Sequence, residues 1–378
     1  MKIINRNKCA IIGSTDLELL HTVKNFPVFM GCVNTNIDED LLHDMIWTIS
    51  GKSGAIQLKE LIPLDILYKE SHGSGDSGSI WDNHHKSFAK YINKFNPSSI
   101  FEIGGGHGRL AKAYRSYGDI AWTILEPNPT PDKNNKAVFI KGFFDKDFVY
   151  EDKFDTVVHS HVFEHLYDLD TFMKDLSNFI DDGKRLIFTL PNMQKMLEKK
   201  YTNCLNFEHT VFLTEPYIEF LLAKYKFQII HKEYFMEDHS IFYSALKDRN
   251  CDPKKLSNNL YKINKNIYNE YIAYHDKLIS SLNSQIDNID SPLYLFGAHI
   301  FSQYLISSGL QINKIKYLLD NDQNKQGKRL YGTPLMVESP EILEFDNNPV
   351  VILKAGVYND EIKNDIITNI NSDTNFLE

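Results

Sequence analysis

The sequence has few of the features that mark secreted, membrane-spanning or zinc-binding proteins. It contains only four cysteines, which are scattered and form no C-x-x-C pair, so neither a disulfide framework nor an intact zinc site is expected. No apolar run approaches the roughly 20 residues that a membrane-spanning helix needs, and the N-terminus MKIINRNKC lacks the apolar core of a signal peptide. We therefore expect a cytoplasmic protein with reduced thiols and no membrane partner.

Positive charge is also scarce. The formal net charge of -9 leaves no basic surplus to neutralise phosphates, so no nucleic-acid partner is expected, although a small anionic ligand remains compatible. With 42% hydrophobic and 24% charged residues the chain has the composition of a globular protein. Its 378 residues are too many for one ordinary core, which favours two or three domains. The composition leaves open whether the chain forms a homo-oligomer.

From Ser98 onward, short apolar runs alternate with amphipathic segments, a pattern typical of an α/β domain with a mainly parallel sheet. The pattern predicts helices from Arg109 to Gly118, through Phe172 and Phe179, and from about Thr214. Strands are predicted at 98–104, 121–127, 137–144, 154–160, 185–191, 227–235 and 239–246. These elements predict a central Rossmann-like domain.

Two further regions flank this domain. Apolar residues at near-helical intervals between Pro253 and Ile289 predict a long helix, and SPLYLFGAH, FSQYLISSGL, KIKYLLDND and PVVILKAG predict a second, smaller Rossmann-like unit. Residues 1 to about 65 look short and irregular. We therefore expect an N-terminal region at 1–65, the main domain at 66–247, a helical linker at 248–290 and a C-terminal domain at 291–378.

The stretch FEIGGGHGRLA, residues 101–111, places glycines directly after the first predicted strand. A P-loop is excluded because no Lys-Ser/Thr pair follows, and the dinucleotide motif G-x-G-x-x-G is met only loosely. The sharper feature is Glu102 ahead of the glycines, followed by Glu126 at the end of the next strand. Glycine lets a backbone approach a ligand closely, and a second acidic residue is placed to accept ribose hydroxyls.

The arrangement E-x-G-x-G resembles the first strand and turn of class I S-adenosylmethionine-dependent methyltransferases. The resemblance implies that Glu102 lies near the ammonium of the cofactor and that Glu126 binds its ribose. It also implies contact of the glycine backbone with the cofactor, whereas His107 packs over the cofactor rather than taking part in chemistry. The full set of implied cofactor-binding residues is Glu102, Gly104, Gly105, Gly106, Glu126, Phe143, Phe144 and His159, with Phe143 and Phe144 flanking the adenine.

The whole chain resembles the three-part methyltransferases that C-methylate nucleotide-linked deoxysugars, in which a small zinc module precedes the class I domain and a C-terminal Rossmann-like domain. The matching stretches are YKESHGSGDSGSIWDNHHKSFA, VFEHLYD, LYLFGAHIFSQYL and YLLDNDQNKQGKRLYGTPL. The N-terminal module departs from the family, because CAIIGS offers only Cys9 and SGKSGAIQL has Ser50 and Ser53 at the later cysteine positions. One thiolate and two hydroxyls do not make a tetrahedral zinc site, so no zinc is expected at Cys9.

The resemblance places the active site at VFEHLYD and NFEHTVF. His165 matches the histidine of the family after the fourth strand, and Glu208 and His209 match the second half of its Y-H-E-H segment, whose tyrosine is Asn206 here. Without that tyrosine, stabilisation of an enolate is weakened, whereas transfer to a hydroxyl needs only a positioned base. We expect His209, held by Glu208, to be that base. The expected catalytic residues are His209, Glu208, His165 and His161.

Two further predictions concern the surroundings of these residues. If His159 and His161 share a strand, they point to the same face, and His161, Glu208 and His209 would then offer ligands to a divalent ion. The alternative is that His161 shapes the cofactor pocket. Contacts with the sugar nucleotide are expected from His72, Asp76, Trp81 and His84, although Trp81 also starts an apolar helical stripe and fits a core position equally well.

The resulting hypothesis is an S-adenosylmethionine-dependent methyltransferase that methylates a hydroxyl of a nucleotide-activated sugar, such as a heptose or deoxysugar of capsule or lipopolysaccharide biosynthesis. Two alternatives stay open. One is C-methylation of a nucleotide-linked keto-deoxysugar, and the other is a non-catalytic nucleotide-binding or scaffold protein.

Overall fold

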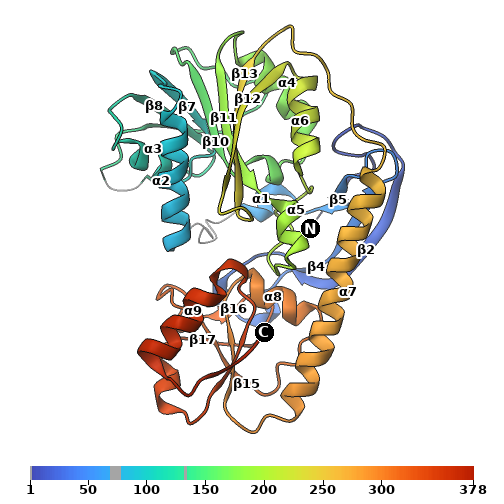
Figure 1. Cartoon of the computed structure of the whole chain (residues 1–378), viewed down its shortest axis with the longest axis vertical. Helices are drawn as coiled ribbons and strands as arrows, with labels where there is room; N and C mark the ends of the chain where they lie inside the picture. The colour runs from blue at the N-terminus through green and yellow to red at the C-terminus, as the bar shows by residue number, and fades with distance from the viewer. Residues whose placement is uncertain (1, 69–77, 132–133) are drawn as a thin grey trace.

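The computed structural model describes residues 2–68, 78–131 and 134–378. Its central element is a seven-stranded sheet in the order β12-β13-β11-β10-β7-β8-β9 (Figure 1). The first five strands along the chain are parallel, and β13 runs antiparallel to both of its neighbours. The strands are β7 (Ser99–Ile103), β8 (Ala121–Glu126), β9 (Val138–Lys141), β10 (Thr156–Ser160), β11 (Arg185–Pro191), β12 (Phe227–Phe235) and β13 (Ser240–Lys247). The predicted α/β fold with a mostly parallel sheet is confirmed.

Helices cover both faces of this sheet. On one face, α2 (Ser79–Asn93) and α3 (Arg109–Tyr114) pack on Ile124 and Val158, whereas on the other face α4 (Leu169–Phe179) and α6 (Glu215–Lys224) pack on Val157 and Phe188. Val157 and Val158 face opposite cores because side chains alternate along a strand. The sequence order of strand, glycine turn and helix therefore places the turn after β7 at the carboxyl edge of the sheet.

The N-terminal region is a small antiparallel sheet rather than an irregular segment. It consists of β2 (Leu17–Pro27), β4 (Leu42–Ser50) and β5 (Ile56–Leu58), beside the short pair β1 (Ile4–Asn5) and β6 (Glu60–Leu61). The expectation of irregular structure was wrong because β2 pairs with β4 through two register shifts, which interrupt the period-2 pattern. Cys9 is buried, and its Sγ lies 3.2 Å from Oγ of Ser53, so a hydrogen bond joins the two loops.

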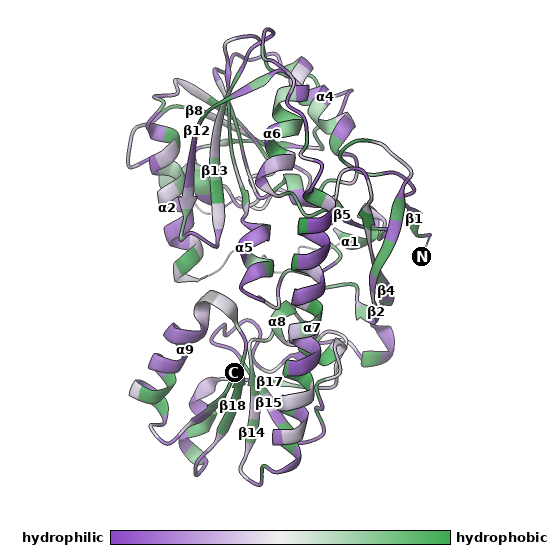
Figure 2. Ribbon diagram, turned by 45° about the vertical axis from the view of Figure 1, so that its right-hand side comes forward, coloured by the Kyte–Doolittle hydropathy of each residue, from purple (hydrophilic) through white to green (hydrophobic). Residues whose placement is uncertain are grey.

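A single long helix, α7 (Leu260–Asp287), runs along all parts of the molecule (Figure 1). Its 28 residues span about 42 Å at 1.5 Å per residue. Leu260 packs in the core of the central domain, Tyr268 and Tyr271 in the core of the N-terminal sheet, and Leu282 in the C-terminal core. Figure 2 shows hydrophilic and hydrophobic residues interleaved along α7, as expected of a helix that buries only part of its surface. No described helix is both long and apolar enough to cross a membrane.

The C-terminal part is a five-stranded parallel sheet in the order β17-β15-β14-β18-β19. The chain leaves β14 toward β15 on one side and returns to β18 on the other, so the order reverses at β14, as in Rossmann-like folds. Its elements are β14 (Leu293–Phe296), α8 (Ile300–Ser307), β15 (Ile315–Leu319), β17 (Val337–Glu338), β18 (Val350–Leu353), α9 (Asn359–Asp365) and β19 (Asn375–Leu377).

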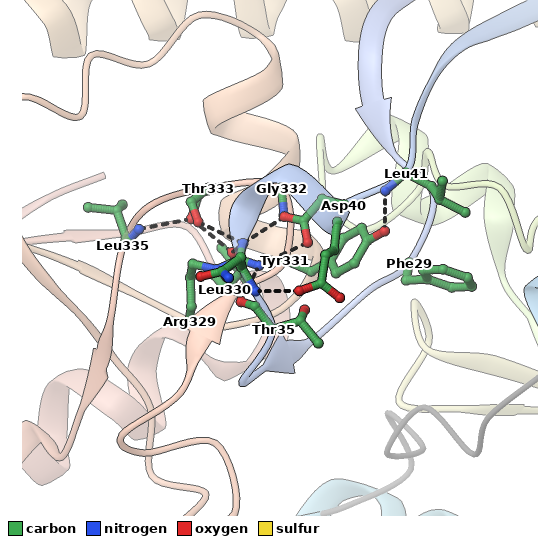
Figure 3. A network of polar contacts seen from close by, with 12 residues as sticks. Phe29, Thr35, Asp40, Leu41, Arg329, Leu330, Tyr331, Gly332, Thr333 and Leu335 are labelled. Carbon is green, nitrogen blue, oxygen red and sulfur yellow. Dashed lines mark hydrogen bonds and ion pairs between the residues drawn. The ribbon is translucent and has the colours of Figure 1, made fainter.

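The N-terminal region also contacts the C-terminal sheet directly. Strand β3 (Cys32–Val33) pairs with β16 (Arg329–Leu330), and the guanidinium of Arg329 donates to both carboxylate oxygens of Asp40, at 2.6 and 2.9 Å (Figure 3). The side chains of Arg329 and Asp40 are 10% and 1% exposed. A charged pair that is almost completely buried therefore fixes this segment to the C-terminal domain.

Candidate active site

The turn after β7 has a backbone that suits glycine. Gly104 and Gly106 have φ angles of +74° and +51°, which side-chain-bearing residues rarely adopt. A Cβ on Gly104 would lie 2.9 Å from Cγ2 of Val162, in the loop after β10, whereas a Cβ on Gly106 would meet no atom within 4 Å. The protein itself thus leaves the space over Gly106 open, which is where a ligand can approach the backbone.

Glu102 lies just inside the end of β7 and is almost fully buried. One of its carboxylate oxygens accepts a hydrogen bond of 2.7 Å from the indole nitrogen of Trp122. Burial raises the pKa of Glu102 to about 7, while this hydrogen bond acts in the opposite direction and the nearby Glu126 raises the pKa further. A Cβ on Gly105 would lie only 2.8 Å from Cδ of Glu102, so the glycine also makes room for the carboxylate.

Glu126 ends β8, the neighbour of β7, and reaches the same turn. Its carboxylate accepts hydrogen bonds from the backbone N–H groups of Gly106, at 3.0 Å, and Asn128, at 3.1 Å. The predicted ribose-binding carboxylate thus lies against the glycine turn. Asn128 in turn donates to the backbone oxygen of Tyr68 at 3.3 Å, which links this edge of the sheet to the segment after α1 (Leu64–Leu67).

The loop after β10 and the segment 206–209 together form a cluster of histidines and carboxylates. Glu164 lies between two histidines, with Oε1 3.0 Å from Nδ1 of His161 and 3.9 Å from Nε2 of His165. On its other side His165 has Nδ1 3.8 Å from Oε2 of Glu208. The ring of His209 lies 5.5 Å from that of His165, centroid to centroid. All four expected catalytic residues therefore come together, and Glu164 joins them.

Burial sets the charges in this cluster. It lowers the pKa of His165 and of His209 to about 4 and raises that of Glu164 and of Glu208 to about 7. For His165 the neighbouring Glu164 opposes the shift, and for His209 the carbonyl of Cys204 does so. At neutral pH both imidazoles are therefore uncharged and have a lone pair available, as a general base or a metal ligand requires.

The structure changes how His209 is held. Glu208 approaches His165 rather than His209, so the expected Glu208–His209 pair is not formed. Instead, Oδ1 of Asn206 accepts hydrogen bonds from the backbone N–H groups of Glu208 and His209, at 2.9 and 2.8 Å. Nδ1 of His209 lies 3.1 Å from Nδ2 of Asn206 and 3.4 Å from the carbonyl oxygen of Cys204. When Nδ1–H donates to that carbonyl, Nε2 carries the lone pair.

Two histidines do not lie where the sequence suggested. Strand β10 ends at Ser160, and His161 has a φ of +52°, so the expected alternation with His159 fails. His159 is fully buried, and its ring stacks on that of Phe188 with the centroids 5.0 Å apart. It therefore packs in the core rather than against the glycine turn. His84 is also fully buried and packs on Phe242, which excludes it as a direct contact for a sugar nucleotide.

The remaining predicted site residues are divided between core and surface. Phe144 packs on Phe172 and Phe179 in the core, whereas Phe143 is 58% exposed, so the two do not flank one ligand. Trp81 is partly buried, with its ring 5.0 Å from that of His161, and so lies against the catalytic cluster. The predicted substrate contacts His72 and Asp76 lie outside the described residues.

Sequence reasoning missed Trp122, Asn206 and Tyr68. The hydroxyl of Tyr68 lies 3.5 Å from Nδ1 of His165. Burial and the nearby Glu208 raise the pKa of this phenol well above its usual value. Tyr68 begins the stretch YKESHGSGDSGSIWDNHHKSFA, but that resemblance gave it no role in the site, because it reaches the cluster only through tertiary contact between the segment after α1 and the loop after β10. Asn206 was noticed only as a replaced tyrosine, although asparagine is a residue whose side chain typically accepts the backbone N–H two residues on in an Asx turn, as it does here from Glu208.

A large cavity of about 1610 Å³ lies beside the glycine turn. Its described lining comes from three parts of the chain. Phe29, in the segment after β2, lies on one side with Tyr331 opposite it. His107 and Arg109 line the cavity from the glycine turn, and Gly297 and Asp320 line it from the carboxyl ends of β14 and β15. Asp320 accepts hydrogen bonds from the backbone N–H of Ala298 and from Nζ of Lys325, both at 2.9 Å. The cavity thus joins the two Rossmann-like sheets.

Comparison with known protein families identifies the type of the central domain. Residues 79–232 match the family model described as "Methyltransferase domain". This match identifies residues 79–232 as a methyltransferase domain. The chain therefore contains a methyltransferase enzyme domain, and its smaller C-terminal sheet lies outside the matched residues.

Solved structures also resemble part of the chain. An S-adenosylmethionine-dependent methyltransferase from Mesorhizobium loti is 14% identical and covers 42% of this chain and 96% of its own, with a TM-score of 0.33. Magnesium protoporphyrin IX methyltransferase from Synechocystis, solved with bound S-adenosylhomocysteine, is 15% identical and covers 47% of this chain and 90% of its own, with a TM-score of 0.36. Similarities this low say nothing about the substrate of this chain. No curated protein matches the sequence significantly.

Proposed function

We propose that this methyltransferase transfers the methyl group of S-adenosylmethionine to a hydroxyl of a nucleotide-activated sugar, such as a heptose or deoxysugar destined for capsule or lipopolysaccharide. The observation that carries the proposal is the cluster of His165, Glu208 and His209 beside the cofactor turn. Transfer to an alcohol needs a neutral base within reach of the hydroxyl and alignment of oxygen, methyl carbon and sulfur. The lowered pKa of His209, about 4, keeps its imidazole neutral at physiological pH.

A continuous set of contacts connects the glycine turn with His165, whose ring lies 5.5 Å from that of His209. Glu126 holds Asn128, Asn128 donates to the backbone of Tyr68, and the hydroxyl of Tyr68 approaches His165. In the proposed step the substrate oxygen forms a bond to the methyl carbon as the bond from carbon to sulfur breaks. The hydroxyl proton passes to Nε2 of His209, and S-adenosylhomocysteine leaves.

The cavity supports the choice of a bulky, nucleotide-linked substrate. Its volume of about 1610 Å³ exceeds the roughly 300–1,000 Å³ of an ordinary small-molecule pocket, so it has room for more than one ligand. Asp320 and the turn at Gly297 lie at the carboxyl ends of β15 and β14, the edge at which open α/β sheets bind ligands. In α1, Ile66 lines this cavity and Tyr68, directly after the helix, contacts His165.

Methyl transfer can be tested with S-adenosylmethionine and a panel of intact sugar nucleotides, followed by mass spectrometry. We expect a gain of one methyl group on at least one sugar nucleotide, and His209→Ala is expected to reduce turnover by roughly 100-fold or more with little change in cofactor affinity. His43→Ala is the matched control, because His43 forms a pair with Glu60, 2.8 Å apart, in the N-terminal sheet. Unchanged turnover of His209→Ala would remove His209 as the base.

One observation favours C-methylation of a keto sugar as a second candidate. The phenol of Tyr68 supplies the cluster with a hydroxyl, which an enolate intermediate requires and which Asn206 does not provide. Assays of the keto and reduced forms of the same sugar nucleotide separate the two candidates. Turnover of the keto form alone would overturn the O-methylation proposal.

A further inference from the structure

The cluster beside the cofactor turn has the composition of a metal site. One ligand atom from each of Glu164, His165 and His209 can be chosen such that all three lie within 4.8 Å of one another. Glu164 and His165 belong to the short helix at Phe163–His165, and His209 comes from the segment before α6. We propose that Glu164, His165 and His209 bind a divalent transition-metal ion in this protein.

The carboxylate of Glu164 is the first observation that indicates a missing cation. Its side chain is 1% exposed, and Oε2 has no hydrogen-bond partner within the described part of the chain. The two groups near Oε1 are the imidazoles of His161 and His165, at 3.0 and 3.9 Å, and no lysine or arginine forms an ion pair with this carboxylate within the described residues. A buried carboxylate without a cationic partner is costly, and a bound ion would offset that cost.

The surroundings of the two histidines leave the correct nitrogen free. Nδ1 of His165 faces the carboxylate of Glu208 at 3.8 Å. Nδ1 of His209 lies 3.1 Å from Nδ2 of Asn206 and 3.4 Å from the carbonyl oxygen of Cys204, and Nε2 is free for an ion in the tautomer whose Nδ1–H donates to that carbonyl. Metal-binding histidines typically donate one ring N–H to a carboxylate or a carbonyl and bind the ion through the other nitrogen. Each ring would therefore present Nε2 to the ion.

The separation of the ligands is wider than in a filled site by a small amount. Nitrogen and oxygen ligands lie about 2.0–2.2 Å from zinc in a tetrahedral site, so two ligands of one ion are about 3.3–3.6 Å apart. Ligand atoms within 4.8 Å of one another reach that geometry when the side chains move inward by less than about 1.5 Å. Two imidazoles and one carboxylate suit zinc, iron(II), manganese or cobalt, whereas magnesium and calcium prefer oxygen ligands.

The role of the ion in catalysis rests on the proposed function, but its binding does not. Three protein ligands leave a position for water or for a substrate oxygen, and a hydroxyl bound there loses its proton more readily. In this form of the enzyme His209 is a ligand rather than the base, and the hydroxyl proton passes to solvent water as the oxygen–carbon bond forms and the carbon–sulfur bond breaks.

Titration of the chelator-treated full-length protein with Co²⁺, followed by visible absorption and calorimetry, tests the site without cofactor or substrate. We expect a single ion per chain, with the intense absorption bands of a low-coordinate nitrogen and oxygen site, and displacement by Zn²⁺. His209→Ala and the isosteric Glu164→Gln are expected to weaken binding by about 10-fold or more. His43→Ala, which disrupts the His43–Glu60 pair elsewhere, is expected to bind Co²⁺ as the wild type does.

Absence of saturable Co²⁺ and Zn²⁺ binding by the wild type would overturn the proposal, as would equal affinity in Glu164→Gln, His209→Ala and the wild type. Circular dichroism shows whether each variant is folded, and Glu164→Gln keeps the size of the side chain if His209→Ala fails to fold. A protein that binds Co²⁺ but methylates no sugar nucleotide refutes the proposed substrate and leaves the metal site standing. Methylation by protein that binds no ion refutes only the metal site.

Discussion

Replacing Asp40 by alanine tests how the N-terminal segment is fixed to the C-terminal domain. Asp40 accepts three hydrogen bonds, two from the guanidinium of Arg329 and one of 2.7 Å from the backbone N–H of Gly332. Its side chain is 1% exposed and that of Arg329 is 10% exposed, so water cannot replace the lost carboxylate. The variant would leave a buried guanidinium that keeps only the carbonyl oxygens of Thr35 and Thr333 as strong partners.

Breaking a buried pair by removing one partner typically costs about 3–5 kcal/mol. We therefore expect Asp40→Ala to lower the free energy of unfolding by about that amount, measured by urea denaturation with circular dichroism. Asp40→Asn keeps the shape of the side chain and removes its charge, so its free energy of unfolding should lie between those of Asp40→Ala and the wild type.

Asp119→Ala is the matched control, because Asp119 pairs with Lys136 on the surface, where both side chains are 66% exposed. It should leave the midpoint of unfolding unchanged. Exposed ion pairs contribute at most about 1 kcal/mol. If Asp40→Ala lowers the free energy of unfolding by less than that, the reasoning that the Arg329–Asp40 pair holds the two domains together is refuted.

Three further predictions concern the active site. Because the pKa of Glu102 is raised to about 7, affinity for S-adenosylmethionine should rise by about 10-fold between pH 6 and pH 8 in calorimetry, and Glu102→Gln should abolish this dependence. The free energy of unfolding should change with pH in the opposite direction to the cofactor affinity. Folding raises the pKa of Glu102 from 4.5, so its contribution to stability is present at low pH and is lost as the pH rises toward 7. Denaturation of the wild type and of Glu102→Gln at several pH values measures this difference. Gly106→Ala should lose cofactor affinity, whereas Gly13→Ala should keep it. The two glycines are matched, because both have a positive φ and open space around an added Cβ, and only Gly106 lies in the turn expected to bind the cofactor. Equal cofactor affinity of the two variants would contradict a close approach of the cofactor to the backbone of Gly106. Tyr68→Phe should lower turnover more than cofactor affinity in steady-state assays, and unchanged turnover would remove its hydroxyl from the reaction.

The pattern of apolar residues along the sequence was sufficient to predict the parallel sheet and the position of the glycine turn at its carboxyl edge. Every strand from β7 to β13 coincides with a predicted strand, because the central strands are buried on both faces and nearly continuously apolar, whereas the edge strands β9 and β12 are partly exposed but keep short apolar runs. It failed for β2, in which the register shifts against β4 break the alternation. It also failed for His159, because a histidine stacked between aromatic rings has no sequence signal that distinguishes it from one in a pocket.

The sequence by itself determined the type of chemistry. Glu102 and Glu126 end neighbouring parallel strands, so a short-range rule of strand and turn places both beside the glycine turn. Only the tertiary structure decided the partners within the histidine cluster, since Tyr68, Glu208 and His209 approach His165 from segments far apart along the chain. The physical reason is that backbone hydrogen bonds and side-chain periodicity act over a few residues, whereas burial and ion pairing depend on the packing of whole elements.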